Sequence, residues 1–241
     1  MVTDIVLVAS ILFAAAFLQS ATGFGMALVC MAVVPLILPI NEAIAFVAIS
    51  CFIATIFIML ANRSGLSFRH GAPLALGMGL GIPLGYYGLR QLDGDLVVTL
   101  LGIVLMAIAV FEFMGTRRAA SKAIPGKFGA IFGLAGGVLA GAFNVGGPPV
   151  VVYAYSQRWG KVETVAILQS VFLAAGVVRN GLMIKSGEYT ADLLTIVAWS
   201  VPAALLGVFL GKRILDRLPL EVLKRIVFAM IFVIGLSYVL R

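Results

Sequence analysis

The sequence predicts an all-α polytopic membrane protein built from two inverted repeats. Of its 241 residues, 62% are apolar and only 11% are charged, and the mean hydropathy is +1.15. A soluble domain carries about 25% charged residues, so this chain has too few polar side chains to cover a globular surface. The charged residues are gathered between long apolar stretches, which is the pattern of a protein that crosses a membrane several times.

Eight apolar stretches predict the helical elements in order. They cover residues 5–38, 43–61, 72–89, 95–114, 127–156, 162–184, 191–210 and 220–240. Most have about the 20 residues that a membrane-spanning helix needs. The first and fifth stretches are too long for one helix, and each is interrupted, by QSATGFG at 19–25 and by GAFNVGGPP at 141–149. Each of these two stretches is expected to form a broken helical hairpin.

Three short matches indicate an internal duplication. Gly23-Phe24-Gly25 corresponds to Asn144-Val145-Gly146 at an offset of 121 residues, Arg63-Ser64-Gly65 to Lys185-Ser186-Gly187 at 122, and GLRQLD at 88–93 to GKRILD at 211–216 at 123. Their common order and slowly drifting offset favour a repeat. The expected units are a first repeat at 1–118, with a broken hairpin at 5–38 and three helices, a cytoplasmic linker at 119–126, and a second repeat at 127–241, with a broken hairpin at 127–156 and three helices.

The distribution of Lys and Arg selects the topology, because cytoplasmic loops carry an excess of these residues. If each long stretch crossed the membrane once, the Lys and Arg of the loops and ends would divide 8 to 8. If each is a re-entrant hairpin, the division is 13 to 3, with Arg179 left inside the membrane. The second arrangement is therefore preferred. It puts both termini outside, leaves three full crossings in each half, and makes the two halves inverted relative to each other.

The two interruptions predict a binding site for a small anion. Inverted hairpins enter from opposite faces, so their tips are expected to meet near the membrane midplane. Each returning half-helix starts at a tip, where unpaired N–H groups and the helix dipole are positive. Glycine lets the backbone approach a ligand closely, and Pro suits a first helical turn. The candidate binding residues at the interruptions are Gln19, Ser20, Thr22, Gly23, Gly25, Asn144, Gly146, Gly147 and Pro148.

Arg179 is a further candidate binding residue because it is a cation within a predicted membrane-spanning segment. Such a charge costs at least ~2.5 kcal/mol near the bilayer centre. Either it attracts the anion, or it snorkels to the nearby outer end of its helix, and both interpretations stay open. Gln169 and Ser170 either reach the cavity or bond a neighbouring helix, with the second slightly favoured.

Other features have structural interpretations. Cys30 and Cys51 lie in apolar stretches without a His or acidic cluster, so they are expected to be packing residues rather than a disulfide or a metal pair. We expect no metal, no cofactor and no nucleic-acid partner. The sequence contains no Gly-x-x-x-x-Gly-Lys motif for ATP, and an enzyme is not expected. Glycines in two helices are interpreted as small-residue packing faces: Gly77, Gly79, Gly81, Gly85, Gly207 and Gly211.

The segments ATGFGMALVCMAVVP and AGGVLAGAFNVGGPPVVVY resemble the paired glycine-rich signatures of the sulfite exporter TauE/SafE family of membrane transporters. The first segment departs from the family pattern at Met26 and Ala27, where further glycines are common. The resemblance covers essentially the whole chain. It implies transport of small sulfur-containing anions, such as sulfite or organosulfonates, across the inner (cytoplasmic) membrane of a bacterium. It also implies coupling to a proton or another ion. The expected partners are this anion, membrane lipid and a co-transported proton or ion, and a homo-oligomer is left open.

A secondary transporter that works by alternating access is the favoured function. A passive small-anion channel is the alternative, because the same inverted hairpins could also build a pore. A continuous pore and the lack of coupling to a gradient would distinguish the channel.

Overall fold

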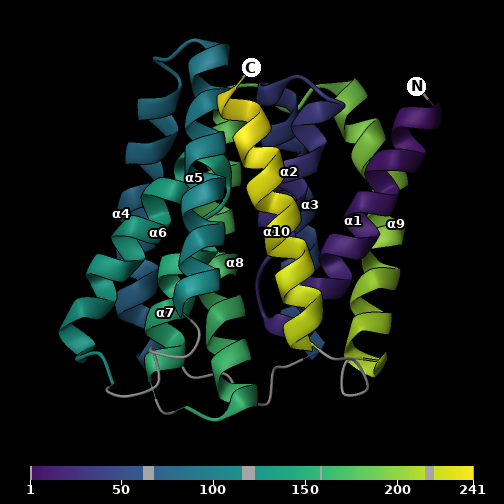
Figure 1. The fold of residues 1–241 in the computed structure, drawn as a ribbon. Helices are drawn as coiled ribbons and strands as arrows, with labels where there is room; N and C mark the ends of the chain where they lie inside the picture. The colour runs from purple at the N-terminus through teal and green to yellow at the C-terminus, as the bar shows by residue number, and fades with distance from the viewer. Residues whose placement is uncertain (1, 62–67, 116–122, 158, 215–219, 241) are drawn as a thin grey trace.

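The computed structural model describes residues 2–61, 68–115, 123–157, 159–214 and 220–240 (Figure 1). Within these ranges the secondary structure is helical, without β-strands, as the sequence predicts. The elements are α1 (Val2–Thr22), α2 (Met26–Val33), η1 (Val34–Leu36), α3 (Ile40–Ala61), α4 (Phe68–Leu89), α5 (Gly94–Gly115), η3 (Gly126–Phe128), α6 (Gly129–Phe143), α7 (Gly147–Ser156), α8 (Lys161–Lys185), α9 (Ala191–Ile214) and α10 (Leu220–Val239). Residues 119–122 of the expected linker and the match at 63–65 lie outside the described residues.

Five helical segments among the described residues are long and apolar enough to cross a membrane, which confirms the prediction of a multi-pass membrane protein. They are Ile40–Leu60, Gly94–Met114, Gly126–Phe143, Glu163–Lys185 and Ala191–Gly211. Helix α4 has 22 residues but is not among them, although the sequence predicts a crossing at 72–89. Its glycines and its two internal prolines, Pro73 and Pro83, lower the mean hydropathy of the segment.

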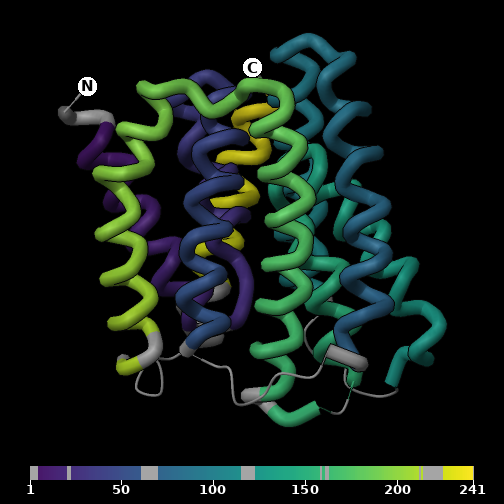
Figure 2. The backbone as a smooth tube through the Cα atoms, turned by 180° about the vertical axis from the view of Figure 1, so that it is seen from behind, coloured from purple at the N-terminus to yellow at the C-terminus, as the bar shows by residue number. Residues whose placement is uncertain are grey.

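The long helices form two layers. Figure 2 shows α4, α8, α3 and α9 in succession, and the neighbours in this layer are in contact. Figure 1 shows α6, α5, α10 and α1 in front of them. The short helices α2 and α7 contact both layers: α2 packs on α3 and α10, and α7 packs on α8 and α6. Helix α1 begins and α10 ends at the same end of the bundle (Figures 1 and 2), which we call the terminal end. The opposite end is called the linker end.

The contacts between the two halves of the chain follow a reciprocal pattern. Helix α1, the first helix of the first half, packs along α9, the fourth helix of the second half. Helix α6, the first of the second half, packs along α4, the fourth of the first half. The third helices, α3 and α8, and the fifth, α5 and α10, pack against each other. Each half therefore supplies the packing surface for the first helix of the other.

Glycine makes the close approach of these helices possible. A Cβ atom at Gly81 of α4 would lie 2.4 Å from the carbonyl oxygen of Leu134 in α6, and one at Gly207 of α9 would lie 2.4 Å from that of Phe13 in α1. The expected packing faces are thus confirmed at Gly77, Gly81, Gly85, Gly207 and Gly211. Gly79 differs, because a Cβ there would meet nothing within 4 Å.

The two predicted interruptions are real breaks in the helices. Helix α1 ends at Thr22 and α2 begins at Met26, and α6 ends at Phe143 and α7 begins at Gly147. Gly23 has φ of 80° and Gly25 has φ of 109°, in the left-handed region that glycine tolerates. Asn144 has φ of 61° and is the C-cap of α6. In Figure 1, α2 runs back toward the terminal end and α7 runs back toward the linker end.

Candidate functional site

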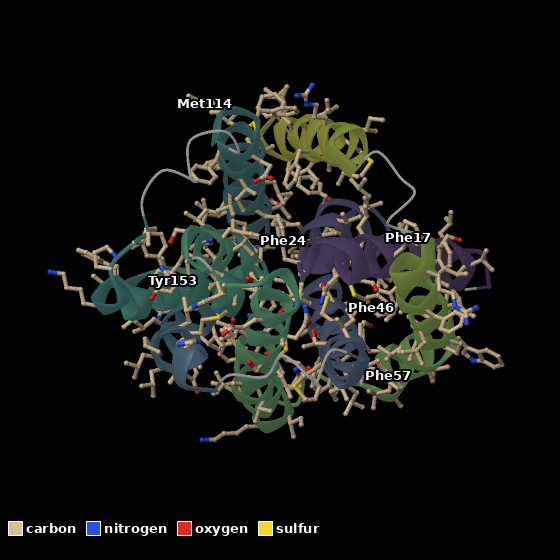
Figure 3. All side chains as sticks on the ribbon, turned by 90° about the horizontal axis from the view of Figure 1, so that it is seen from below. Phe17, Phe24, Phe46, Phe57, Met114 and Tyr153 are labelled. Atoms are coloured by element: carbon tan, nitrogen blue, oxygen red, sulfur yellow. The ribbon has the colours of Figure 1, made fainter. Side chains whose placement is uncertain are left out.

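A cavity of about 80 Å³ lies where the two breaks meet. We call it the central cavity. Both breaks line it, together with residues of α3, α4 and α8. One water molecule needs about 10–15 Å³ of such cavity volume, so the central cavity has room for a small oxyanion. Phe24 lines the central cavity and lies near the middle of the bundle in Figure 3. Phe57 and Met114 lie toward the outside of the bundle in the same view.

Six of the ten candidate residues line the central cavity: Gln19, Gly25, Asn144, Gly146, Gly147 and Arg179. Ser20 does not, because its hydroxyl donates a hydrogen bond to the carbonyl oxygen of Val208 in α9, at 2.8 Å, and so holds α1 to α9. Gly23 lies in the first break and Pro148 in the first turn of α7, but neither lines the cavity. The side chain of Thr22 lies outside the described residues.

Two glutamines hold the first break in shape. The Oε1 atom of Gln19 accepts a hydrogen bond from the backbone N–H of Met26 at 3.3 Å, so the end of α1 caps the start of α2. The Nε2 atom of the buried Gln169, in α8, donates to the carbonyl oxygen of Gly23 at 2.7 Å. Gln169 therefore bonds a neighbouring segment, the interpretation that the sequence favours. Ser170 instead donates to Ile167 in its own helix.

Sequence reasoning did not find the contribution of α3 to the central cavity. Cys51, Phe52 and Thr55 line it, and Thr55 Oγ1 lies 3.5 Å from Gln19 Nε2. Besides Cys51, the apolar stretch 43–61 contains only two polar residues, Ser50 and Thr55, and the available signal was that Thr55 lies on the same helix face as Cys51, one turn away. Both cysteine thiols are free, and Cys30 is fully buried.

Arg179 lies inside the bundle, with 2% of its surface exposed. Its Nη1 atom donates to the carbonyl oxygens of Ala140 and Gly141, in the last turn of α6. A cation is stabilised at the C-terminal end of a helix, where the carbonyl groups are unpaired and the dipole is negative. The guanidinium therefore does not extend to an exposed interface, and the snorkelling interpretation does not describe it. Its Nε and Nη2 atoms are buried and have no hydrogen-bond partner.

The buried side-chain nitrogen and oxygen atoms of the cavity lining that lack a hydrogen-bond partner are all donors. Besides the two guanidinium nitrogens of Arg179, the Nδ2 atom of Asn144 is buried without a hydrogen-bond partner. The starts of α2 and α7, at Gly25 and Gly147, also lie at the cavity, and the positive ends of their dipoles lie there with them. Among the described residues that line the cavity, none is acidic. The arrangement has the charge and the hydrogen-bonding character that a small anion requires.

The fold and the central cavity define the class of the molecule. It is a multi-pass membrane protein in which two helix breaks enclose a positively charged, donor-lined cavity. Within this class, the chain belongs to the sulfite exporter TauE/SafE family, whose model matches residues 7–238. This confirms the resemblance that the two glycine-rich segments carry.

Two curated relatives support the assignment. The chain is 27% identical over 240 residues to a probable sulfite/organosulfonate exporter, TauE, of Cupriavidus necator, which covers 96% of this chain and 92% of that protein. It is 28% identical over 184 residues to a probable inner membrane transporter protein, TsaS, of Comamonas testosteroni, which covers 73% of this chain and 75% of that protein. No solved structure matches the chain.

Proposed function

We propose that the protein is a secondary transporter that binds a small sulfur-containing anion in the central cavity and carries it across the inner membrane. The observation that carries the proposal is the set of buried donors on Arg179 and Asn144 that lack a protein partner. Leaving a buried donor unsatisfied costs about 1–3 kcal/mol, and more for a charged group. An oxyanion such as sulfite, or the sulfonate group of an organosulfonate, offers several acceptor oxygens and a compensating charge. The name of the Cupriavidus relative favours this substrate class.

We further propose that α1–α2 and α6–α7 are re-entrant hairpins of two inverted repeats. The opposite directions in which α2 and α7 return support this arrangement, as does the reciprocal packing of α1 on α9 and of α6 on α4. The repeats would occupy 1–118 and 127–241, joined by the cytoplasmic linker at 119–126. The terminal end then faces the outside of the cell.

Reporter fusions test this topology. Alkaline phosphatase fused after residue 241 is expected to be active, because the enzyme folds only outside the cytoplasm, and green fluorescent protein fused there is expected to be dark. The same reporters inserted at 119–126 should give the reverse pattern. A fluorescent C-terminal fusion, with the protein at the wild-type level in the membrane, would overturn the inverted arrangement.

A transport assay separates the secondary transporter from the passive channel. In proteoliposomes preloaded with unlabelled sulfite, a transporter that alternates between two states should accelerate the entry of labelled sulfite by counterflow. A channel gives no counterflow. Imposed proton and sodium gradients, tested in turn, identify the co-transported ion, because only the coupled gradient drives accumulation. Equilibration without counterflow or accumulation would replace the transporter by the channel.

Asn144 offers a matched pair of substitutions at the central cavity. Its φ of 61° suits Asn, Asp and Gly, so Asn144→Asp and Asn144→Gly should both fold. Asn144→Gly removes one donor to a charged ligand, and sulfite binding should weaken roughly tenfold. Asn144→Asp also adds a carboxylate of the same shape and should weaken binding by about a further tenfold or more. Isothermal titration of the purified variants measures both, and equal affinities for Asn144→Asp and the wild type would remove Asn144 from the site.

A further inference from the structure

A second cavity, of about 340 Å³, lies at the terminal end of the bundle. We call it the vestibule. Residues of α3, α4, α5, α6 and α8 line it, together with the α4–α5 and α8–α9 connections. Its polar and charged side chains are Asn41, Tyr86, Arg90, Arg179 and Glu188. Arg179 also lines the central cavity, so its side chain stands between the two cavities.

An ion pair spans the vestibule. Glu188, on the α8–α9 connection, places Oε1 2.9 Å from Nη2 of Arg90, on the α4–α5 connection. The hydroxyl of Tyr86, in the last turn of α4, donates a hydrogen bond to the same oxygen. The Arg90 guanidinium lies 5.0 Å from the centre of the Tyr86 ring. A guanidinium and a hydroxyl thus converge on one carboxylate oxygen.

The position of Glu188 follows from the end of α8. Gly187 has φ of 69°, and the backbone N–H of Glu188 donates to the carbonyl oxygen of Met183 at 3.1 Å. This is the pattern by which a left-handed glycine terminates a helix and turns the chain. The carboxylate is therefore carried by a short connection fixed to the same helix that carries Arg179, less than three turns away.

We propose that Arg90 and Tyr86 form an outer binding site for the transported oxyanion, and that Glu188 fills this site when no anion is present. The inference rests on the proposed function. A carboxylate and a sulfite or sulfonate group present the same chemistry to a guanidinium and a hydroxyl: a negative charge shared by acceptor oxygens. The incoming anion replaces the Glu188 carboxylate, enters the vestibule, and has Arg179 as its next cation.

The exposure of the pair allows this exchange. The Arg90 side chain is 44% exposed and that of Glu188 is 21% exposed. Ion pairs that water reaches are weak, because solvent screens their attraction. A dissolved anion can therefore compete with the carboxylate, which it could not do for a fully enclosed pair. A purely structural tie between α4 and α8 would use the same contacts but would not respond to sulfite.

Substitutions with opposite expected effects distinguish a binding site from a structural tie. Glu188→Gln removes the competing charge and should lower the half-saturating concentration of sulfite about threefold. Arg90→Gln should raise it by about the same factor, and Tyr86→Phe should raise it less. Lys185→Gln and Asp192→Asn are matched controls, because they remove charges at exposed positions of the same end that do not line the vestibule. A structural tie would destabilise both partner variants and leave the sulfite dependence unchanged.

The assay uses the whole chain, with a C-terminal tag, in proteoliposomes. Vesicles that expose the tag on their outer surface are captured, so that the terminal end of the protein faces outward. Sulfite is added outside, and its half-saturating concentration is measured together with the thermal stability of each variant. Opposite shifts for Glu188→Gln and Arg90→Gln support the outer site. If sulfite flux in the wild type is lost in Arg179→Gln but neither vestibule variant shifts, the proposed function stands and the outer site is wrong. No sulfite-dependent flux in the wild type would overturn both.

Discussion

Arg179→Gln is expected to abolish measurable sulfite binding while leaving the protein folded. The substitution removes the charge and two buried donors, Nε and Nη2, that have no partner in the protein. Hydrogen bonds to charged groups contribute about 1.5–3 kcal/mol each, so the loss of two corresponds to roughly 10² to 10⁴ in affinity. The substitution also removes a buried charge whose desolvation is costly, so the fold should survive.

Thermal stability with and without sulfite measures this effect. Wild-type protein at a sulfite concentration 100 times its Kd should gain about 2.7 kcal/mol, and Arg179→Gln should gain nothing. Lys185→Gln is the control, because it removes a cation from an exposed position of the same helix. Without sulfite, Arg179→Gln should stay folded, because the loss of the hydrogen bonds to Ala140 and Gly141 is offset by the removal of a buried charge. An Arg179→Gln variant that binds sulfite normally would contradict the placement of the anion in the central cavity.

Arg179→Lys refines the interpretation. Lysine keeps the charge but lacks the planar fork of donors that holds the α6 carbonyls and the cavity at the same time. If charge alone attracts the anion, Arg179→Lys should bind nearly as well as the wild type. If the guanidinium geometry matters, its affinity should fall between those of the wild type and Arg179→Gln. The comparison separates attraction from positioning at a single residue.

The breaks could be predicted from the sequence because their cause is local. Glycine and polar side chains are concentrated at 19–25 and, together with proline, at 141–149, so these stretches identify both breaks and five of the candidate residues that line the central cavity. The cavity lining contributed by α3 could not be predicted, since Cys51 and Thr55 differ little from the apolar side chains around them. Their role depends on which face of α3 meets the breaks.

The partners of Ser20 and Arg179 could not be predicted from the sequence either. Both were candidates because a polar group inside the membrane needs a partner, and both have one. The rotation of α1 and α8 about their axes determines which partner each side chain meets. That rotation aims Ser20 at Val208 of α9, and Arg179 at the end of α6. Contacts between distant segments decide the rotation, and no local pattern in either helix records it.

The largest effect on stability is expected at the interface of α4 and α6. A Cβ at Gly81 would lie 2.4 Å from the carbonyl oxygen of Leu134 and 2.8 Å from the nitrogen of Val138. Both are backbone atoms, so the helices would have to separate. Overpacking of this kind costs about 1–3 kcal/mol and occasionally more. Gly81→Ala should accordingly lower the temperature at which the protein in detergent loses its monodisperse peak.

Gly79→Ala is the matched control, two residues away on the same helix. A Cβ at Gly79 meets nothing within 4 Å, and alanine favours a helix over glycine by about 1 kcal/mol, so this variant should be as stable as the wild type or more so. Equal losses in both variants would show that glycine supports α4 itself rather than its packing on α6. Because Met78 and Ile82 of α4 line the central cavity, separating α4 from α6 should also weaken sulfite binding. The packing of α6 on α4, which fixes the position of the second break, would then determine the affinity of the central cavity for sulfite.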